Sequence, residues 1–309
     1  RHFRSELGLQ MQSMLSEALP SFVQLEKILK GYDRRGNFLG LFFTDAFLLS
    51  DFFLVRSFLK WKNTYVVKME EWMDIVSELD AAVSMADFRY NHPEATDAEI
   101  VDGSPVLFEA KNLYHPFLGA KAVKNDFSIH DDNYYIITGA NMAGKSTFLR
   151  SLGVNYILAM SGMPVFAGSL KVSRFQLFSS MRTTDDLTHG ISYFNAELLR
   201  LEQLMQFCKR GELRTLIILD EILKGTNSLD KLNGSRLFLE AISRMPVTGV
   251  IATHDLELSR MAESSPDRFH NYCFEIDLGT DVTYTYKIQP GVARNQNATF
   301  LLNKILERN

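Results

Sequence analysis

The chain has 309 residues, of which 46% are hydrophobic and 23% charged, and its formal net charge at pH 7 is −4. This composition is typical of a folded globular protein of about two domains, and it excludes a disordered, collagen-like or purely coiled-coil chain. The two cysteines, Cys208 and Cys273, exclude a disulfide scaffold and a cysteine-rich zinc module, so a reducing, cytoplasmic location is expected.

The charge is unevenly distributed along the chain. Residues 1–108 contain 11 Lys and Arg residues and 16 Asp and Glu residues, a net charge of −5, whereas the remainder carries +1. A stand-alone DNA-binding surface has a basic excess, and neither part shows one. Nucleic-acid binding would therefore need a local basic patch or oligomerisation.

Residues 1–104 are predicted to form a mainly helical domain. Apolar side chains recur there at three- and four-residue spacing, as at Leu15, Leu19 and Phe22. The most apolar stretch, residues 38–61, contains four charged side chains. A helix that crosses a bilayer needs about 20 residues with almost no charge. We therefore expect an aromatic-rich helix in this stretch and no membrane segment.

Residues 105–309 have the pattern of an α/β domain. The long apolar runs in this part are typical of buried parallel strands. The predicted elements, in chain order, are a strand at 134–138, a helix at 145–160, strands at 216–219 and 250–252, a hairpin of 272–277 and 282–288, and a short helix at about 298–306.

A glycine-containing loop between the first strand and its helix reads GANMAGKS and matches the pattern G-x-x-x-x-G-K-[ST] in full. In such a loop, backbone N–H groups turn toward phosphates and the helix N-terminus adds partial positive charge. Lys145 would reach the β- and γ-phosphates, and the Ser146 hydroxyl would be a ligand of Mg²⁺. The alternative is a strand-to-helix turn that binds no nucleotide. The predicted nucleotide-binding residues are Gly139, Ala140, Asn141, Met142, Ala143, Gly144, Lys145, Ser146 and Thr147, with ATP and Mg²⁺ as cofactors.

Two acidic residues, Asp220 and Glu221, end the next apolar run, about 75 residues after the phosphate loop. An aspartate at this point can hold Mg²⁺ directly or through water, and the neighbouring glutamate can orient or deprotonate the attacking water. His254 follows the third apolar run, where a strand end faces the ligand crevice of an open α/β sheet. We predict Asp220 as a metal ligand and Glu221, His254 and Lys145 as catalytic residues. The alternatives are an ordinary acidic loop and a surface or core histidine.

In this order, the motifs resemble those of the MutS family of DNA mismatch-repair ATPases. The likeness covers about residues 106–306, with a much weaker one between residues 65–92 and the end of the family's core or lever helices. The family's phosphate loop reads GPNMGGKST, and residues 139–147 of this chain read GANMAGKST. The family's acidic segment DEIGRGTSTxDG corresponds to DEILKGTNSLDKL at 220–232, and its THxxEL corresponds to THDLEL at 253–258. The family segments DDL…GxSTFMxEM and RHP correspond to residues 185–197 and to His115-Pro116.

The resemblance implies a P-loop NTPase of ABC-ATPase-like type, with a mixed sheet flanked by helices. It further implies ATP hydrolysis and a head-to-tail homodimer in which each ATP lies between two ATPase domains. Ser192 would then reach the γ-phosphate of the partner's ATP, and Asn227 and Asp230 would belong to the loop that couples the two sites. The residues themselves also allow a helix N-cap at Ser192, an ordinary turn at Asn227, and either an adenine-stacking ring or a plain strand aromatic at Tyr286.

Several positions depart from the family pattern. Ala140 replaces a proline and Ala143 a glycine, and both are small enough to leave phosphate access open. Ile191 replaces an arginine, and Leu223-Lys224 replaces Gly-Arg. The 104 N-terminal residues are too few for the mismatch-reading, connector and clamp parts of a full mismatch sensor.

We therefore expect a divergent or truncated MutS-type ATPase that acts in DNA repair or a related DNA transaction and does not read mismatches by itself. Double-stranded DNA is the expected partner, on the basis of the resemblance and not of charge. The alternative is a nucleotide-gated clamp or interaction protein with little turnover.

Overall fold

The chain divides into two compact units, Arg1–Asn91 and His92–Asn309. The sequence predicts a division at residues 104 and 105. Residues 92–103 belong to the second unit because strand β1 (Glu99–Val101) pairs in parallel with β5 (Ser169–Ser173). The computed structural model describes residues 5–33, 50–103, 105–181, 193–210, 213–223, 227–278 and 282–294.

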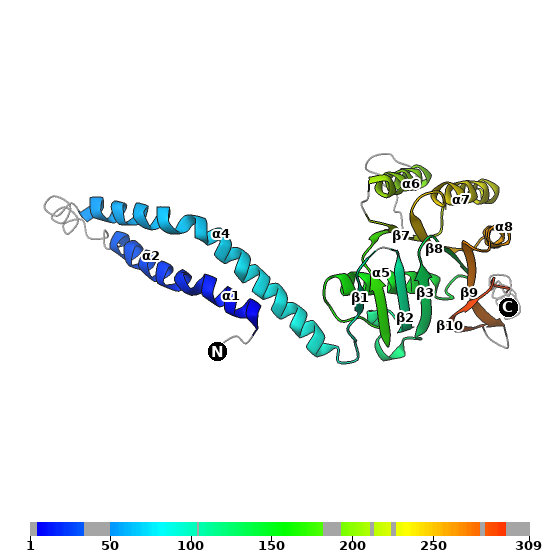
Figure 1. Cartoon of the computed structure of the whole chain (residues 1–309), viewed down its shortest axis with the longest axis horizontal. Coiled ribbons are helices and arrows are strands. Elements are labelled where there is room, and N and C mark those ends of the chain that lie inside the picture. Colours follow the sequence, from blue (N-terminus) through cyan, green and yellow to red (C-terminus); the bar gives the residue numbers. More distant parts are fainter. Residues whose placement is uncertain are drawn as a thin grey trace, which may run out of the picture. The chain divides into compact units, whose positions relative to one another are not determined.

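The first unit is helical, as predicted (Figure 1). Two tryptophans of its longest helix are buried and join it to the preceding helices. The ring N–H of Trp61 donates to the carbonyl oxygen of Ser21 at 2.8 Å, and that of Trp72 donates to Met14 at 3.2 Å. The elements are α1 (Glu6–Met14), the 3-10 helix η1 (Leu15–Glu17), α2 (Ala18–Asp33) and α4 (Ser50–Asn91).

Many apolar side chains of this unit are exposed, including Leu19 and Phe22 of the predicted apolar pattern. A pair of helices buries only the stripe along which the two helices meet, so apolar residues on the other sides stay exposed. Among the residues that the structure describes, no helix combines the length and apolar composition needed to cross a membrane.

The second unit contains two β-sheets (Figure 1). One is four-stranded, in the order β1-β5-β2-β3, with β2 at Leu107–Leu113 and β3 at Asn125–His130. The other is six-stranded, in the order β10-β9-β4-β8-β7-β6, and only its β9–β10 pair is antiparallel. Its strands are β4 (Tyr134–Gly139), β6 (Gln176–Ser180), β7 (Thr215–Asp220), β8 (Val247–Thr253), β9 (Phe269–Leu278) and β10 (Val282–Pro290).

The mixed sheet, its parallel strands and the terminal hairpin confirm the corresponding predictions. The predicted helix at 145–160 is also confirmed, whereas the one at 298–306 lies outside the described residues. The sequence did not indicate the four-stranded sheet. The helices of this unit are α5 (Lys145–Met160), α6 (Tyr193–Arg210), α7 (Ser228–Ile242) and α8 (Met261–Ser264), with 3-10 helices η3 (Pro116–Lys121) and η5 (Leu256–Arg260).

Both faces of the six-stranded sheet are covered, α5 lying on one side and α6 and α7 on the other (Figure 1). In β4, Tyr135 and Ile137 belong to the core with α5 and the four-stranded sheet, whereas Tyr134 and Ile136 belong to the core with α6 and α7. Successive side chains of a strand point to opposite faces. The central strands therefore bury side chains on both faces, which explains their apolar runs.

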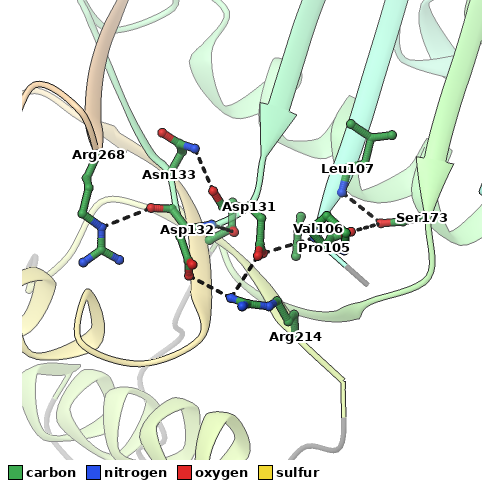
Figure 2. A network of polar contacts seen from close by, with 10 residues as sticks. Pro105, Val106, Leu107, Asp131, Asp132, Asn133, Ser173, Arg214 and Arg268 are labelled. Carbon is green, nitrogen blue, oxygen red and sulfur yellow. Dashed lines mark hydrogen bonds and ion pairs between the residues drawn. The ribbon is translucent and has the colours of Figure 1, made fainter. Parts of the chain in front are cut away.

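Polar side chains hold the turn between β3 and β4 to its neighbours (Figure 2). One terminal nitrogen of Arg214, just before β7, lies 2.9 Å from carboxylate oxygens of both Asp131 and Asp132. Asp131 also accepts from the N–H of Val106, and the Asp132 carbonyl accepts from Arg268. This network joins the turn that leads into β4 to the start of β2 and to β7.

Replacing Arg214 with alanine is expected to lower the free energy of unfolding by about 1.5 kcal/mol, because it removes a charge-assisted hydrogen bond to Asp132 and an ion pair with Asp131 at a partly buried position. Chemical denaturation would measure the change. Arg236→Ala is the matched control, because Arg236 forms an exposed i,i+4 ion pair with Glu240, for which we expect about 0.5 kcal/mol or less. Equal effects of the two substitutions would contradict this role.

Candidate nucleotide-binding site

Three parallel strands of the six-stranded sheet end at the same edge. The phosphate loop follows β4, Asp220 is the last residue of β7, and His254 follows β8. A cavity of about 480 Å³ lies at this edge, and Lys145, Ser146, Asp220 and His254 all line it. The structure thus brings together predicted phosphate, metal and catalytic residues that are separated by more than 100 positions in the sequence.

The phosphate loop needs glycine at two of its positions. Gly144 has a left-handed φ of 111°, and a Cβ there would lie 3.1 Å from the ring of Tyr286. A Cβ on Gly139 would lie 2.8 Å from the carbonyl oxygen of Phe274. Ala143 is buried and does not have a positive φ, so its methyl group is accommodated where the family pattern has glycine.

Lys145 is tied to the loop that precedes it. Its ammonium donates to the carbonyl oxygens of Gly139 at 2.7 Å and Ala140 at 3.0 Å, and its side chain is almost fully buried. Burial lowers the pKa of Lys145 to about 8, against the opposing effect of the Asp220 and Glu221 carboxylates. The lysine is therefore held at the cavity wall with a charge that is poorly solvated.

His254 lies between Lys145 and Glu221. Its Nδ1 is 3.2 Å from Lys145 Nζ, and its Nε2 is 3.6 Å from a carboxylate oxygen of Glu221. Burial and the Lys145 ammonium lower the pKa of His254 below its ordinary value, with Glu221 opposing them. Nδ1 also lies 3.1 Å from the Gly139 carbonyl oxygen, so the tautomer of the ring decides whether Nδ1 donates to this oxygen or accepts from the ammonium. Nε2 faces Glu221 in either tautomer.

Glu221 does not line the cavity as Asp220 does. Its backbone has a left-handed φ of 69°, and its N–H donates to the carbonyl oxygen of Ala252 at 2.9 Å. Its carboxylate forms an ion pair with Lys231 in the first part of α7. The sequence reasoning missed Lys231. A lysine near a helix N-terminus, where the helix dipole disfavours a cation, is the signal that points to it.

Two of the three residues predicted to act across a dimer interface, Asn227 and Asp230, contact each other within one chain. Asn227 is the N-cap of α7, where its Oδ1 accepts from the N–H of Asp230 at 2.9 Å and its amide donates to the Asp230 carboxylate at 2.6 Å. Both side chains are exposed. Ser192, together with Ile191 and Lys224, lies outside the described residues.

Tyr286 forms part of the cavity wall beside the phosphate loop, and His115 and Leu118 also line the cavity. It has a left-handed φ of 52° and lies in an irregular part of β10. Asn125 holds this irregularity, because its amide donates to the Tyr286 carbonyl at 3.0 Å and accepts from the N–H of Ile288 at 2.9 Å. No sequence pattern had indicated Asn125.

Comparison with known proteins places these observations in a family. The family model described as MutS domain V matches residues 135–300. The chain is 30% identical over 212 residues to the DNA mismatch repair protein MutS of Staphylococcus carnosus, which covers 65% of this chain and 24% of that protein. It is 34% identical over 212 residues to MutS of Rickettsia bellii, covering 66% and 23%.

A plant protein is similarly related. The DNA mismatch repair protein MSH2 of Zea mays is 29% identical over 267 residues, which cover 77% of this chain and 27% of that protein. The chain thus spans about a quarter of the length of these relatives. Because the matched segment of 135–300 is more than half of the chain and contains the phosphate loop, Asp220 and His254, the chain belongs to the MutS family, and this segment is the family's domain V, its ATPase domain.

Proposed function

We propose that this chain binds ATP with Mg²⁺ and hydrolyses it, and that it acts in DNA repair or a related DNA transaction. The observation that carries the proposal is the single cavity at the ends of the parallel strands, which Lys145, Ser146, Asp220 and His254 line together. Its volume of about 480 Å³ is within the size range of small-ligand sites. The alternative of a glycine-rich turn without a nucleotide gives no reason for these four residues to meet.

The side chains at the cavity fit a magnesium nucleotide. Mg²⁺ in such sites takes one or two protein ligands, with phosphate oxygens and water completing its coordination. Ser146 supplies a hydroxyl and Asp220 a carboxylate at the cavity wall. Lys145 and the N-terminus of α5 supply positive charge for the phosphates. Tyr286 offers a half-exposed aromatic ring at the cavity wall for the base.

In the hydrolysis that we propose, a water oxygen forms a bond to the γ-phosphorus while the bond from phosphorus to the bridging oxygen of ADP breaks. Glu221 accepts the proton of the water. The His254 ring lies between Glu221 and Lys145, where it can orient the carboxylate or stabilise the γ-phosphate oxygens. Lys145 balances the negative charge on the phosphates.

Binding of a fluorescent ATP analogue and release of phosphate by the purified chain test this proposal. We expect saturable Mg²⁺-dependent binding and measurable turnover, each lost when Asp220 is replaced with asparagine or alanine. Equal turnover in EDTA would contradict the magnesium role, and no nucleotide binding at all would overturn the proposal.

Membership of the MutS family also suggests partners for this chain. We propose a homodimer through the ATPase domain in which Ser192, Asn227 and Asp230 of one subunit contribute to the partner's ATP site. Double-stranded DNA is the proposed ligand of the dimer, since the relatives are named DNA mismatch repair proteins. A salt-dependent mobility shift of duplex DNA would support this part. The absence of a shift at low salt would restrict the function to nucleotide binding and hydrolysis.

A nucleotide-gated clamp with little turnover is a second candidate. The ion pair between Glu221 and Lys231 favours it, because the proposed base is turned to a helix and not to the cavity. Steady-state turnover faster than about one per second, within the ordinary range for enzymes, would contradict this candidate.

A further inference from the structure

An ion pair beside the nucleotide cavity joins Glu221, the residue after strand β7, to helix α7. Lys231 lies in the first part of α7, and its ammonium donates to one carboxylate oxygen of Glu221. The side chains are only 19% and 13% exposed. The second carboxylate oxygen faces His254 Nε2 at 3.6 Å. One oxygen of the proposed catalytic base is therefore held by the Lys231 ammonium, and the other faces the His254 ring.

A catalytic base must accept a proton from water and must face the reacting water, and this contact affects both requirements. A hydrogen bond between two charged groups is roughly twice as strong as a neutral one, and limited exposure to water strengthens it further. A carboxylate that already accepts from an ammonium is a poorer acceptor for a proton of water. The contact also directs Glu221 toward α7, and Glu221 is not among the residues that line the cavity, although its neighbour Asp220 is.

The place of Lys231 is not explained by the stability of its own helix. The N-terminal end of a helix carries partial positive charge, which disfavours a nearby lysine. Asp230, one position earlier, already provides the favourable acidic residue of the first turn and pairs with the N-cap Asn227. In the family pattern DEIGRGTSTxDG, the residue at this position is glycine, which has no side chain that reaches Glu221.

We propose that Lys231 is a positioning residue that holds Glu221 beside the nucleotide cavity and thereby restrains ATP hydrolysis without affecting ATP binding. This inference rests on the proposed function of Glu221 as the base. Hydrolysis then requires the carboxylate to leave the ammonium and turn toward the γ-phosphate, where it accepts the proton of the attacking water.

The test compares Lys231→Met with Lys231→Arg in the full chain. Methionine keeps the length of the side chain and removes its charge, whereas arginine keeps the ion pair. For Lys231→Met we expect kcat for ATP to rise about fivefold, a modest part of the effect that a general base contributes, with KM and the Kd of a fluorescent ATP analogue within about twofold. Lys231→Arg should keep the wild-type rate. Lys231→Leu serves as a second uncharged variant if the methionine variant does not fold.

Two further variants make the result specific. Arg236→Met removes a cation from an exposed ion pair on the same helix and should leave kcat unchanged. In a Glu221→Gln background, Lys231→Met should no longer raise the rate, because the group that it releases is absent. A general loosening of α7 would instead raise or lower the rate in both backgrounds.

An unchanged or lower kcat in Lys231→Met, with normal ATP binding, overturns the restraint and leaves the proposed function intact. A rate for Lys231→Arg as high as that for Lys231→Met also overturns it. Failure of the wild-type chain to bind ATP overturns the proposed function, and the restraint with it.

Discussion

Glu221→Gln is expected to leave ATP binding within about twofold of wild type and to lower turnover at least about a hundredfold, the usual contribution of a general base. The amide keeps the size of the side chain and can still accept from Lys231, but it cannot take a proton from water. Phosphate release and binding of a fluorescent ATP analogue measure the two effects. Sedimentation with ATP and Mg²⁺ should show a dimer that persists in this variant, whereas ADP should not produce one.

The control for this substitution is Glu240→Gln on α7, which alters an exposed carboxylate paired with Arg236 and should change neither quantity. Undiminished turnover in Glu221→Gln would exclude Glu221 as the base. A monomer with every nucleotide would exclude the proposed composite sites for this chain, while the turnover measurement would still test the base.

Lys145→Met is expected to weaken ATP binding at least about a hundredfold, because the variant loses the cation that faces the β- and γ-phosphates. It should not destabilise the protein at pH 7. Burial lowers the pKa of Lys145 in the folded chain to about 8 from its ordinary value of 10.5, so the buried charge costs the folded state about 3 kcal/mol where both states are protonated. Lys145→Met removes this cost, and the loss of the hydrogen bonds to Gly139 and Ala140 offsets part of the gain in stability.

The lowered pKa of Lys145 also predicts how the free energy of unfolding changes with pH. Between pH 8 and 10.5 the unfolded chain binds more protons at this lysine than the folded chain does, so this lysine makes the free energy of unfolding of wild type rise with pH. The rise should be absent in Lys145→Met, and the variant's advantage should shrink through the same window. Denaturation at a series of pH values from 7 to 10 measures it.

Lys171→Met is the control, since Lys171 forms an exposed pair with Glu99 and should affect neither ATP binding nor the slope. A Lys145→Met variant that is much less stable than wild type at pH 7 would show that its hydrogen bonds outweigh the cost of burying the charge.

Local sequence patterns predict the central α/β elements and the part of the cavity that the phosphate loop forms. Apolar runs and the glycine loop are local signals, and parallel strands connected through helices end at one edge of a sheet. That topology predicts that Lys145, Asp220 and His254 meet there, and all three line one cavity in the structure. Their roles in nucleotide binding and catalysis stay predictions. The helix from Lys145 to Met160 was likewise predicted to its ends, since the phosphate loop marks where it begins.

Pairings between distant side chains depend on tertiary packing, and local patterns do not predict them. The four-stranded sheet joins β1 and β2 to β5, about 60 residues or more away along the chain. Because of this pairing, residues 92–103 belong to the second unit, His92–Asn309. The contacts of Asn125 with Tyr286 and of Lys231 with Glu221 depend on side-chain positions across two elements. Local patterns specify the period and the ends of an element, but a pair of charges meets only where the packing of the sheet against its helices places them.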